Sequence, residues 1–558
     1  MKQRLRLPIF LGAILAALLF STLPSQGAIW SPDITPPGNN LIGVNIVDSF
    51  FNSGENVSTL TAQGVPRINP DGTPNARLCT AIGVDPCNKP DQTYVANLLL
   101  PACKAANEQW CIENVSIRKK DEPVTKTATL IRQVDSALVA NTPGDGLPGG
   151  SSISLWRAEG MKNSGGADTY AVYVVLKATK FPGRGPVFDE FTAMVLPYSD
   201  KSGFQYERPF SEEMMLPNGT IRIGTRGSAG ECAWTETGRC GLMEDFPEGV
   251  RASLTLRVSN QLTGWLMGRM ADPSITVETF DAEQNKIAID AEPVKVPKFY
   301  ALTDRSKATP AMLQNAPRNS DFSGVTNSRA NEQGAFITIE NWKDVAKDTA
   351  AGLVSTWSAT TIINGFGSQC LADRTKLLGV VTTNAMVYEG TAPAFMDGTL
   401  NYKVGGMHLN PDGSVFQGTY DLVMRKGTAQ CLYGFTDAPI SATVTIVDAG
   451  KEERIQTSSL QELGSGTDKW LKLSARGFTF SSPTLKIKLN QEKPVAAAPA
   501  QPAQPAQSST QAGSSQSASG APAVKVPSKR ISITCVKGKV TRKVSGVAPK
   551  CPAGFKKK

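Results

Sequence analysis

The chain has 558 residues, 58 Lys and Arg against 49 Asp and Glu, and a single histidine, which gives a formal net charge of +9. One histidine without C-x2-C spacing excludes the usual zinc sites, so no metal or cofactor is expected. At about 100 to 200 residues per domain, the length excludes a single core and predicts several domains.

The chain begins with a segment typical of a secretory signal peptide. Residues 1–27 carry three bases, then an apolar run, then small residues suited to cleavage. The apolar run is shorter than the roughly 20 residues that a membrane span needs, and no second run of that length follows. We therefore expect export, followed by cleavage that leaves no transmembrane span.

All ten cysteines lie in near-neighbour pairs, which in an exported chain indicates a disulfide framework. Proximity predicts the pairs Cys79–Cys87, Cys103–Cys111, Cys232–Cys240, Cys370–Cys431 and Cys535–Cys551. The first four cysteines still permit three connectivities, because spacing alone does not choose among them.

Short β-branched and aromatic runs between Gly, Pro, Asn and Asp clusters predict a mainly β body. The expected strands are 170–181, 253–258, 274–280, 335–339, 353–363, 378–388, 399–409, 414–424, 441–447 and 470–489. Short helices are expected only at 311–315 and 341–349.

These strands favour two tandem β-sandwich-like domains. The predicted divisions are a cysteine-rich N-terminal module at 28–124, β-sandwich-like domains at 125–297 and 335–490, and a connector at 298–334.

Two stretches of the body look alike. Residues 217–225 read PNGTIRIGT and residues 411–419 read PDGSVFQGT, and a cysteine and later a Trp-Leu pair follow each of them. An internal duplication would explain the similarity. Chance is the alternative, because Asn-Gly and Asp-Gly turns recur in β proteins.

A low-complexity linker and a basic tail end the chain. Residues 491–528 are dominated by Ala, Pro, Gln and Ser without an aromatic residue, a composition that predicts disorder. From Lys525 onward there are eleven Lys and Arg and no acid, which leaves the body near −5 once the signal's three bases are also removed. A mildly acidic body thus precedes the basic module at 529–558.

Two β-branched runs flank Lys537-Gly538-Lys539 and predict a small hairpin, closed by Cys535 and Cys551, that displays bases. Such a surface would attract anionic cell-envelope polymers or acidic polysaccharide, with affinity falling as salt rises. Nucleic acid is not expected, because stacking aromatics are not interleaved. A solubilising charge run is the alternative. The bases predicted to bind are Lys537, Lys539, Arg542, Lys543, Lys550, Lys556, Lys557 and Lys558.

The tail sequences ITCVKGK at 533–539 and PKCPAGFKKK at 549–558 resemble a C-terminal element shared by many exported proteins of actinobacteria. Body segments such as LPAC at 100–103 and WCIE at 110–113 resemble the bodies of members of that group. The resemblance implies an exported protein and its lineage, but no activity, so it transfers no catalytic residue.

The sequence contains no catalytic signature. His408, beside the turn at 410–413, is predicted to be structural, and no G-x-S-x-G motif supplies a nucleophile for it. Hydrolysis of a polysaccharide needs only two carboxylates at a set separation, and the 49 acids single out no pair. A secreted hydrolase is therefore an alternative function.

Two tryptophans are the predicted ligand-binding residues of the body. Trp265 and Trp470 share strand parity with polar neighbours, so each is expected on the polar side of its strand, where it would stack on a sugar ring or a protein. The alternative is that another sheet covers them. The favoured function is an exported, cell-surface-associated binding or adhesion protein that is retained at the cell wall or surface; a structural envelope component is a further alternative.

Overall fold

The structure is a computed structural model of the chain. It describes residues 40–48, 58–68, 74–85, 87–123, 126–134, 139–140, 146–202, 232–236, 239–314, 325–362, 369–371, 376–434, 440–448, 451–455, 459–464, 469–480, 484–491, 531–537, 540–546 and 556–557. The predicted signal at 1–27 and all but the first residue of the predicted linker lie outside these ranges.

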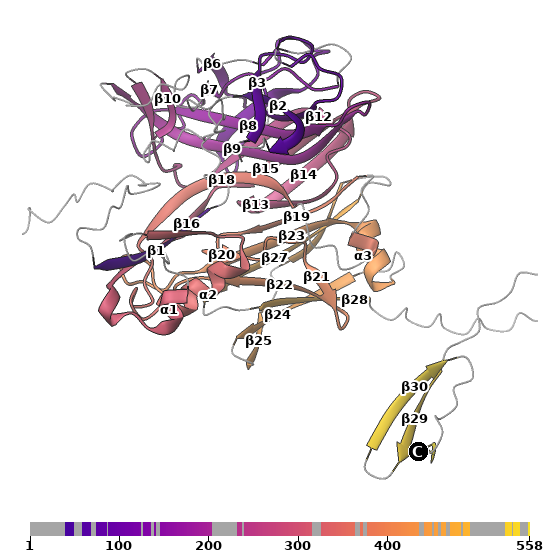
Figure 1. Cartoon of the computed structure of the whole chain (residues 1–558). Coiled ribbons are helices and arrows are strands. Elements are labelled where there is room, and N and C mark those ends of the chain that lie inside the picture. The colour runs from indigo at the N-terminus through magenta and orange to yellow at the C-terminus, as the bar shows by residue number, and fades with distance from the viewer. Residues whose placement is uncertain are drawn as a thin grey trace, which may run out of the picture. The chain divides into compact units, whose positions relative to one another are not determined.

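The chain is mainly β, as predicted, and divides into two compact units, Met1–Pro494 and Val495–Lys558. The division falls inside the predicted linker. We call the first unit the body and the second the tail, and describe each by itself (Figure 1).

A large central sheet organises the body. Its main strands, in order of hydrogen-bonded neighbours, are β4 (Thr93–Leu99), β8 (Thr169–Lys180), β9 (Pro186–Ser202), β18 (Gly352–Ile362), β13 (Gly264–Arg269), β19 (Leu377–Thr383), β23 (Gly418–Arg425) and β27 (Trp470–Phe478). Of these neighbours only β13 and β19 run parallel.

Shorter strands extend this sheet. They are β2 (Thr59–Ile68) and β3 (Pro74–Cys79) beyond β4, β7 (Ser154–Arg157) and β6 (Thr129–Gln133) beside β8, β11 (Arg239–Met243) and β10 (Cys232–Glu236) beside β9, and β26 (Ser459–Leu463) beside β27.

A second sheet covers one face of the central sheet. Its antiparallel strands, in spatial order, are β14 (Ala271–Thr279), β15 (Gln284–Glu292), β12 (Val250–Ser259) and β5 (Cys111–Lys119). Alternate residues of β8, including Tyr170 and Val172, pack in one cluster with Leu254 and Ile289 of this sheet. The period-two alternation of a strand thus sends half of β8 into this core.

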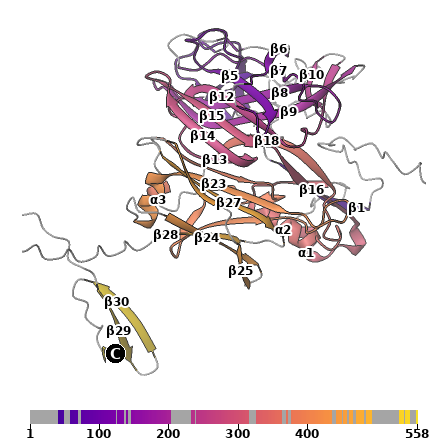
Figure 2. The same ribbon diagram turned by 180° about the vertical axis from the view of Figure 1, so that it is seen from behind.

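A third layer covers the opposite face. Ala171 and Tyr173 of β8 pack in a cluster with residues of β22 (Thr399–Gly405) and β20 (Val387–Tyr388). The remaining strands of this layer are β28 (Thr484–Gln491), β24 (Ile440–Asp448), β25 (Lys451–Ile455) and β21 (Ala394–Met396), and Figures 1 and 2 show β28 and β24 lying below β23 and β27. The central sheet is therefore buried on both faces.

The N-terminal strand is inserted between two later strands. β1 (Leu41–Val47) pairs antiparallel with β16 (Val294–Asp304) and parallel with β17 (Val325–Arg329), and β16 also pairs with β18. Residues after the predicted signal thus complete the body of the protein.

The described ranges contain three α-helices, α1 (Pro310–Gln314), α2 (Gln333–Trp342) and α3 (Lys426–Tyr433), and two short 3-10 helices, η2 (Arg305–Lys307) and η3 (Gln369–Leu371). The prediction of a strand at 335–339 is wrong, because these residues lie in α2. Ala335, Phe336, Ile339 and Trp342 are buried with helical spacing, which outweighs the β-branched composition. Within the described residues, none of these helices has the length and apolar character required to span a membrane.

Most other expected strands are confirmed, including 170–181 as β8, 253–258 within β12 and 353–363 as β18. The run expected at 470–489 is two strands, β27 and β28, in different layers. The helix expected at 341–349 is corrected, because α2 ends at Trp342.

The predicted domain boundaries within the body do not separate compact units. Strands β4 and β5 of residues 28–124 pair with β8 and β12, and β9 and β13 of residues 125–297 pair with β18. Backbone ladders thus join the three predicted parts in one unit. The sequence could not show this, because strand partners far apart in the chain leave no local pattern.

Four predicted disulfides are confirmed. They are Cys79–Cys87, Cys103–Cys111, Cys232–Cys240 and Cys370–Cys431, with Cα–Cα distances of 5.7, 4.9, 5.7 and 5.7 Å. The predicted partner of Cys535, Cys551, lies outside the described residues, so that pair stays a prediction.

Candidate functional site

The two tryptophans predicted to bind a ligand are buried. Trp265 is 0% exposed and Trp470 is 2% exposed. Neither ring can act as a platform for a sugar or a protein partner, so this prediction is wrong for the folded body.

The reason lies in the covered central sheet. Trp265 is paired across strands with Gly379, and a Cβ on that glycine would overlap the indole ring. Trp470 lies in the opposite core, with the Arg425 guanidinium 4.6 Å from its ring centroid. Strand parity separates two faces, but it identifies the solvent side only when one face is exposed.

Trp470 lies on the same side of its strand as the polar residues Lys472 and Ser474, but these residues are not exposed to solvent. Lys472, two residues after Trp470, is 5% exposed and forms an ion pair with Asp272. Ser474 donates a hydrogen bond to the buried carboxylate of Asp421. The polar residues of β27 therefore bind partners in the interior rather than water.

The same sheet places the tryptophans of the two Trp-Leu pairs on opposite faces. Cross-strand neighbours run from Trp265 through Gly379 and Met424 to Leu471, whereas Trp470 lies opposite Arg425. A duplication aligned on these pairs would give both tryptophans equivalent positions. Residues 217–225, the first of the two similar stretches, lie outside the described residues.

Asp272 and Asp421 are neighbours in the interior, since the Asp272 backbone N–H donates to Asp421 Oδ2 at 2.9 Å. Asp421 also accepts two hydrogen bonds from Arg476, at 2.7 and 2.8 Å. Although burial raises the pKa of Asp272, hydrogen bonds and charge from Lys472 and Arg251 outweigh it and lower that pKa. A general acid needs a raised pKa, so this pair favours a structural link between layers.

His408 is held by one backbone carbonyl and one carboxylate. Its Nδ1 lies 3.0 Å from the Phe480 carbonyl oxygen, and its backbone N–H donates to Asp348 Oδ1 at 2.9 Å. The prediction of a structural histidine agrees with these contacts. Within the part of the chain that the structure describes, no group of three His, Cys, Asp or Glu is placed to hold a metal ion.

The loop closed by Cys103 and Cys111 presents an aromatic residue that the sequence analysis missed. Trp110 has φ of 57°, a left-handed backbone conformation that is a true outlier for a bulky side chain. Its indole lies 4.8 Å from the Phe188 ring of β9, centroid to centroid, with a 34° tilt. Both rings are partly exposed, and the adjacent Val187 is 50% exposed.

Several contacts fix this loop, which we call the Trp110 loop (residues 103–111). The Glu108 carboxylate accepts hydrogen bonds from the backbone N–H groups of Lys104 and Ala105. The Trp110 backbone N–H donates to Gln284 Oε1 at 3.1 Å, and Gln109 Nε2 donates to Asp281 Oδ2 at 2.7 Å. Disulfide, backbone and side chains together hold the strained residue.

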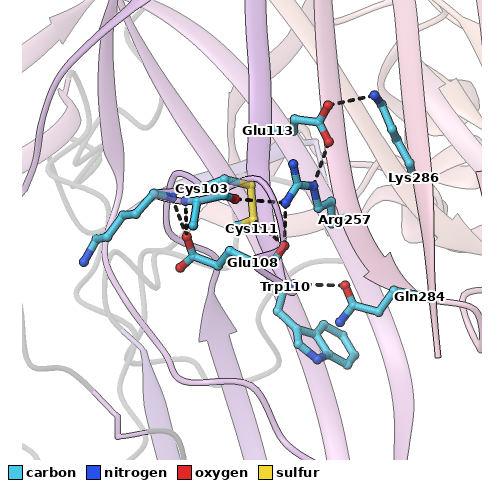
Figure 3. The surroundings of a disulfide bond; sticks show 10 residues. Cys103, Glu108, Trp110, Cys111, Glu113, Arg257, Gln284 and Lys286 are labelled. Carbon is cyan, nitrogen blue, oxygen red and sulfur yellow. Dashed lines mark hydrogen bonds and ion pairs between the residues drawn. A yellow bond between two sulfur atoms is a disulfide. The ribbon is translucent and has the colours of Figure 1, made fainter. Parts of the chain in front are cut away.

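Arg257 of β12 connects the Trp110 loop to the sheet beneath it. Its Nη1 donates to the carbonyl oxygens of Ala105 and Glu108 at 3.2 and 2.7 Å, and its Nε to Glu113 at 2.7 Å. Lys286 adds a second ion pair to Glu113, also at 2.7 Å. Figure 3 shows Arg257 between the loop and Glu113, while the indole of Trp110 points away from the disulfide.

The charges around Arg257 are mutually compensated. Burial raises the pKa of Glu113, but hydrogen bonds from Lys286 and Arg257 outweigh it, so the net shift is downward. The Arg257 guanidinium also lies 4.4 Å from the ring centroid of Phe280. This arrangement supports the loop and compensates the charges of Arg257, Lys286 and Glu113.

One buried group beside Trp110 is incompletely satisfied. Gln284 is 0% exposed, and its Nε2 has no hydrogen-bond partner among the described residues. Figure 3 shows the Gln284 side chain beside Trp110. A tryptophan next to a loop-closing cysteine was the only sequence signal for this site.

The tail brings its bases together through strand pairing. β29 (Ile531–Lys537) pairs with β30 (Val540–Gly546) and with β31 (Lys556–Lys557). Cys535 is opposite Arg542 on one side and Lys557 on the other, and Val536 is opposite Lys556. The predicted hairpin is confirmed for the described strands. Lys539, Lys550 and Lys558 lie outside the described residues.

Comparison of the chain with protein-family models, curated proteins and solved structures finds no match.

Proposed function

We propose that the chain is an exported, cell-surface-associated binding or adhesion protein. Its tail holds it at anionic envelope polymers, and its body binds a carbohydrate or protein ligand. The resemblance of the tail to exported proteins of actinobacteria supports the same compartment.

The pairing of the tail strands carries this proposal. Neighbouring strands lie about 4.8 Å apart, so the register gathers Lys537, Arg542, Lys543, Lys556 and Lys557 within a small three-stranded sheet. No acid occurs from Lys525 to the end of the chain, so nothing in this segment compensates the bases. A dense positive field of this kind favours polyanions over neutral ligands.

Pull-down on isolated cell envelopes tests the proposal. Binding of the mature protein should fall as NaCl rises from about 50 to 500 mM, because the Debye length shortens below 5 Å. A variant with the five tail bases changed to Gln should lose this binding. The matched control changes five exposed body lysines to Gln: Lys89, Lys119, Lys162, Lys307 and Lys347.

Two results would overturn the proposal. One is native-like binding by the tail variant, and the other is an equal loss in the body control. Envelopes extracted free of lipid should still bind the protein, since loss of binding after extraction would assign the tail to lipid headgroups instead of envelope polymers.

A further inference from the structure

We infer that the Trp110 loop and Phe188 form a binding site for an uncharged sugar ring of a polysaccharide. The inference rests on the proposed function, because it assigns the ligand of the body to a carbohydrate and locates where it binds. The site combines two partly exposed aromatic residues, with ring centroids 4.8 Å apart, and a loop whose exposed residues are polar or small.

The size of the aromatic surface favours a sugar over a protein. A stable protein interface covers about 800 Å² on each partner around an apolar centre. Of the exposed residues of the Trp110 loop, Lys104, Asn107 and Gln109 are polar, and Ala105 and Ala106 are small. A pyranose has an apolar C–H face that fits one or two aromatic rings and hydroxyls that fit a polar rim.

The charge balance favours an uncharged ring. Arg257 and Lys286 are both paired with Glu113, and the Glu108 carboxylate is occupied by two backbone N–H groups of the loop. Asp281 accepts from Gln109 and from the backbone of Glu283. Arg257 and Lys286 are thus engaged by Glu113 and not available to an acidic sugar, and Lys104 is the one base of the Trp110 loop itself.

The strained backbone at Trp110 indicates that the fold holds the indole in a defined position at the surface. A left-handed tryptophan is costly, and such strain persists only where surrounding contacts impose it. The disulfide, Gln284 and Arg257 provide those contacts. A preorganised aromatic side chain loses little conformational freedom on binding, which raises affinity.

Affinity electrophoresis of the whole mature protein in native gels tests the inference. The gels contain soluble mannan, dextran or arabinogalactan, with salt high enough to screen the tail. At least one of these glycans should retard the native protein. Trp110→Ala and Phe188→Ala should weaken that retardation about tenfold or more, as loss of a buried aromatic anchor does. Met396→Ala is the control, since Met396 is a 56% exposed apolar residue of a different sheet.

Trp110→Phe is a second control, for misfolding of the Trp110→Ala protein. It keeps an aromatic ring at this position and should retain partial retardation. Three results would overturn the inference: no retardation by any of the glycans, native retardation of Trp110→Ala, or an equal loss in Met396→Ala. A Trp110→Ala protein that is less stable yet fully retarded would make the ring pair a structural bridge. The salt-dependent envelope pull-down is a separate measurement, so the proposed tail function can stand if the sugar site fails.

Discussion

Two loops of this protein share a cysteine spacing and a tryptophan but present it differently. In both the Cys103–Cys111 and the Cys232–Cys240 pair, the two cysteines are eight positions apart. Trp110 of the first loop is partly exposed, whereas Trp234 of the second is 0% exposed. The same covalent closure therefore carries one ring toward solvent and one into the core.

The difference arises from what lies across from each ring. Trp234 is paired across the β10–β11 hairpin with Gly241, and the absent side chain leaves room for the indole. The guanidinium carbons of Arg132 and Arg239 lie 5.2 and 5.6 Å from its ring centroid. Trp110 lies in a loop that is not a hairpin and has Phe188 as its neighbour. The cysteine spacing predicts that a disulfide closes each loop. The residue that lies across from each tryptophan determines whether its ring is buried.

Filling the space under Trp234 should give the largest effect. Gly241→Ala places a Cβ where the indole now lies, so we expect a loss of about 3 kcal/mol in the free energy of unfolding. Denaturant unfolding measures this loss. Gly334→Ala is the control, because open space surrounds that helical glycine and alanine there should be neutral or stabilising by up to about 1 kcal/mol. A harmless Gly241→Ala would refute the explanation for the buried ring.

Removing either disulfide should cost similar stability and have different functional effects. Replacing both cysteines of one loop by Ala should lower the free energy of unfolding by about 2.5 kcal/mol in each case, because the closed loops are equally long. Only the Cys103→Ala, Cys111→Ala protein should also lose retardation by glycans. Equal loss of retardation in both proteins would show that stability, and not the Trp110 loop, controls binding.

Local signals were enough for the mainly β class, most strands and four disulfides. Runs such as 170–181 are unambiguous, because strands buried on both faces read as continuous apolar stretches. The error at 335–339 came from a short run in which β-branched residues and helical spacing coexist. Ile337, the exposed β-branched residue of α2, contributed to that composition without contributing to the core.

The partners of each strand could not be predicted. Nothing near Trp265 indicates that β13 lies between β18 and β19, so nothing indicated that both of its faces are covered. The Trp110 site depends equally on distant residues, since Gln284 and Arg257 follow the loop by more than 140 positions. Proximity of this kind is a property of the fold, and a single sequence carries no direct record of it.

The left-handed backbone at Trp110 predicts that glycine is tolerated better than alanine at this position, the reverse of the order expected at Trp234. Trp110→Gly should be more stable than Trp110→Ala by about 1 kcal/mol, because glycine adopts a positive φ without strain. Trp234 does not share the positive φ, so Trp234→Ala should be more stable than Trp234→Gly. Denaturant unfolding of the four variants measures both orders. If the glycine and alanine variants have the same order of stability at both positions, backbone strain does not distinguish Trp110 from Trp234.

The smallest effect concerns the pH dependence of the support beneath the Trp110 loop. The pKa of Glu113 is lowered in the folded protein, since hydrogen bonds from Lys286 and Arg257 outweigh the opposing effect of burial. A depressed carboxyl pKa contributes stability that is present above the unfolded pKa near 4.5 and disappears as the pH falls through the folded pKa. Because Glu113 is partly exposed, the contribution should be below about 1 kcal/mol.

Glu113→Gln should therefore destabilise the protein at pH 7 and should reduce the loss of stability between pH 5 and pH 3. Denaturant unfolding across this range compares the variant with the native protein. Glu248→Gln is the matched control, because it removes one carboxylate from an exposed position in the turn before β12. If Glu113→Gln keeps the native profile, the ion pairs with Arg257 and Lys286 do not stabilise the loop, and the disulfide with the Gln284 contact must hold Trp110 by themselves.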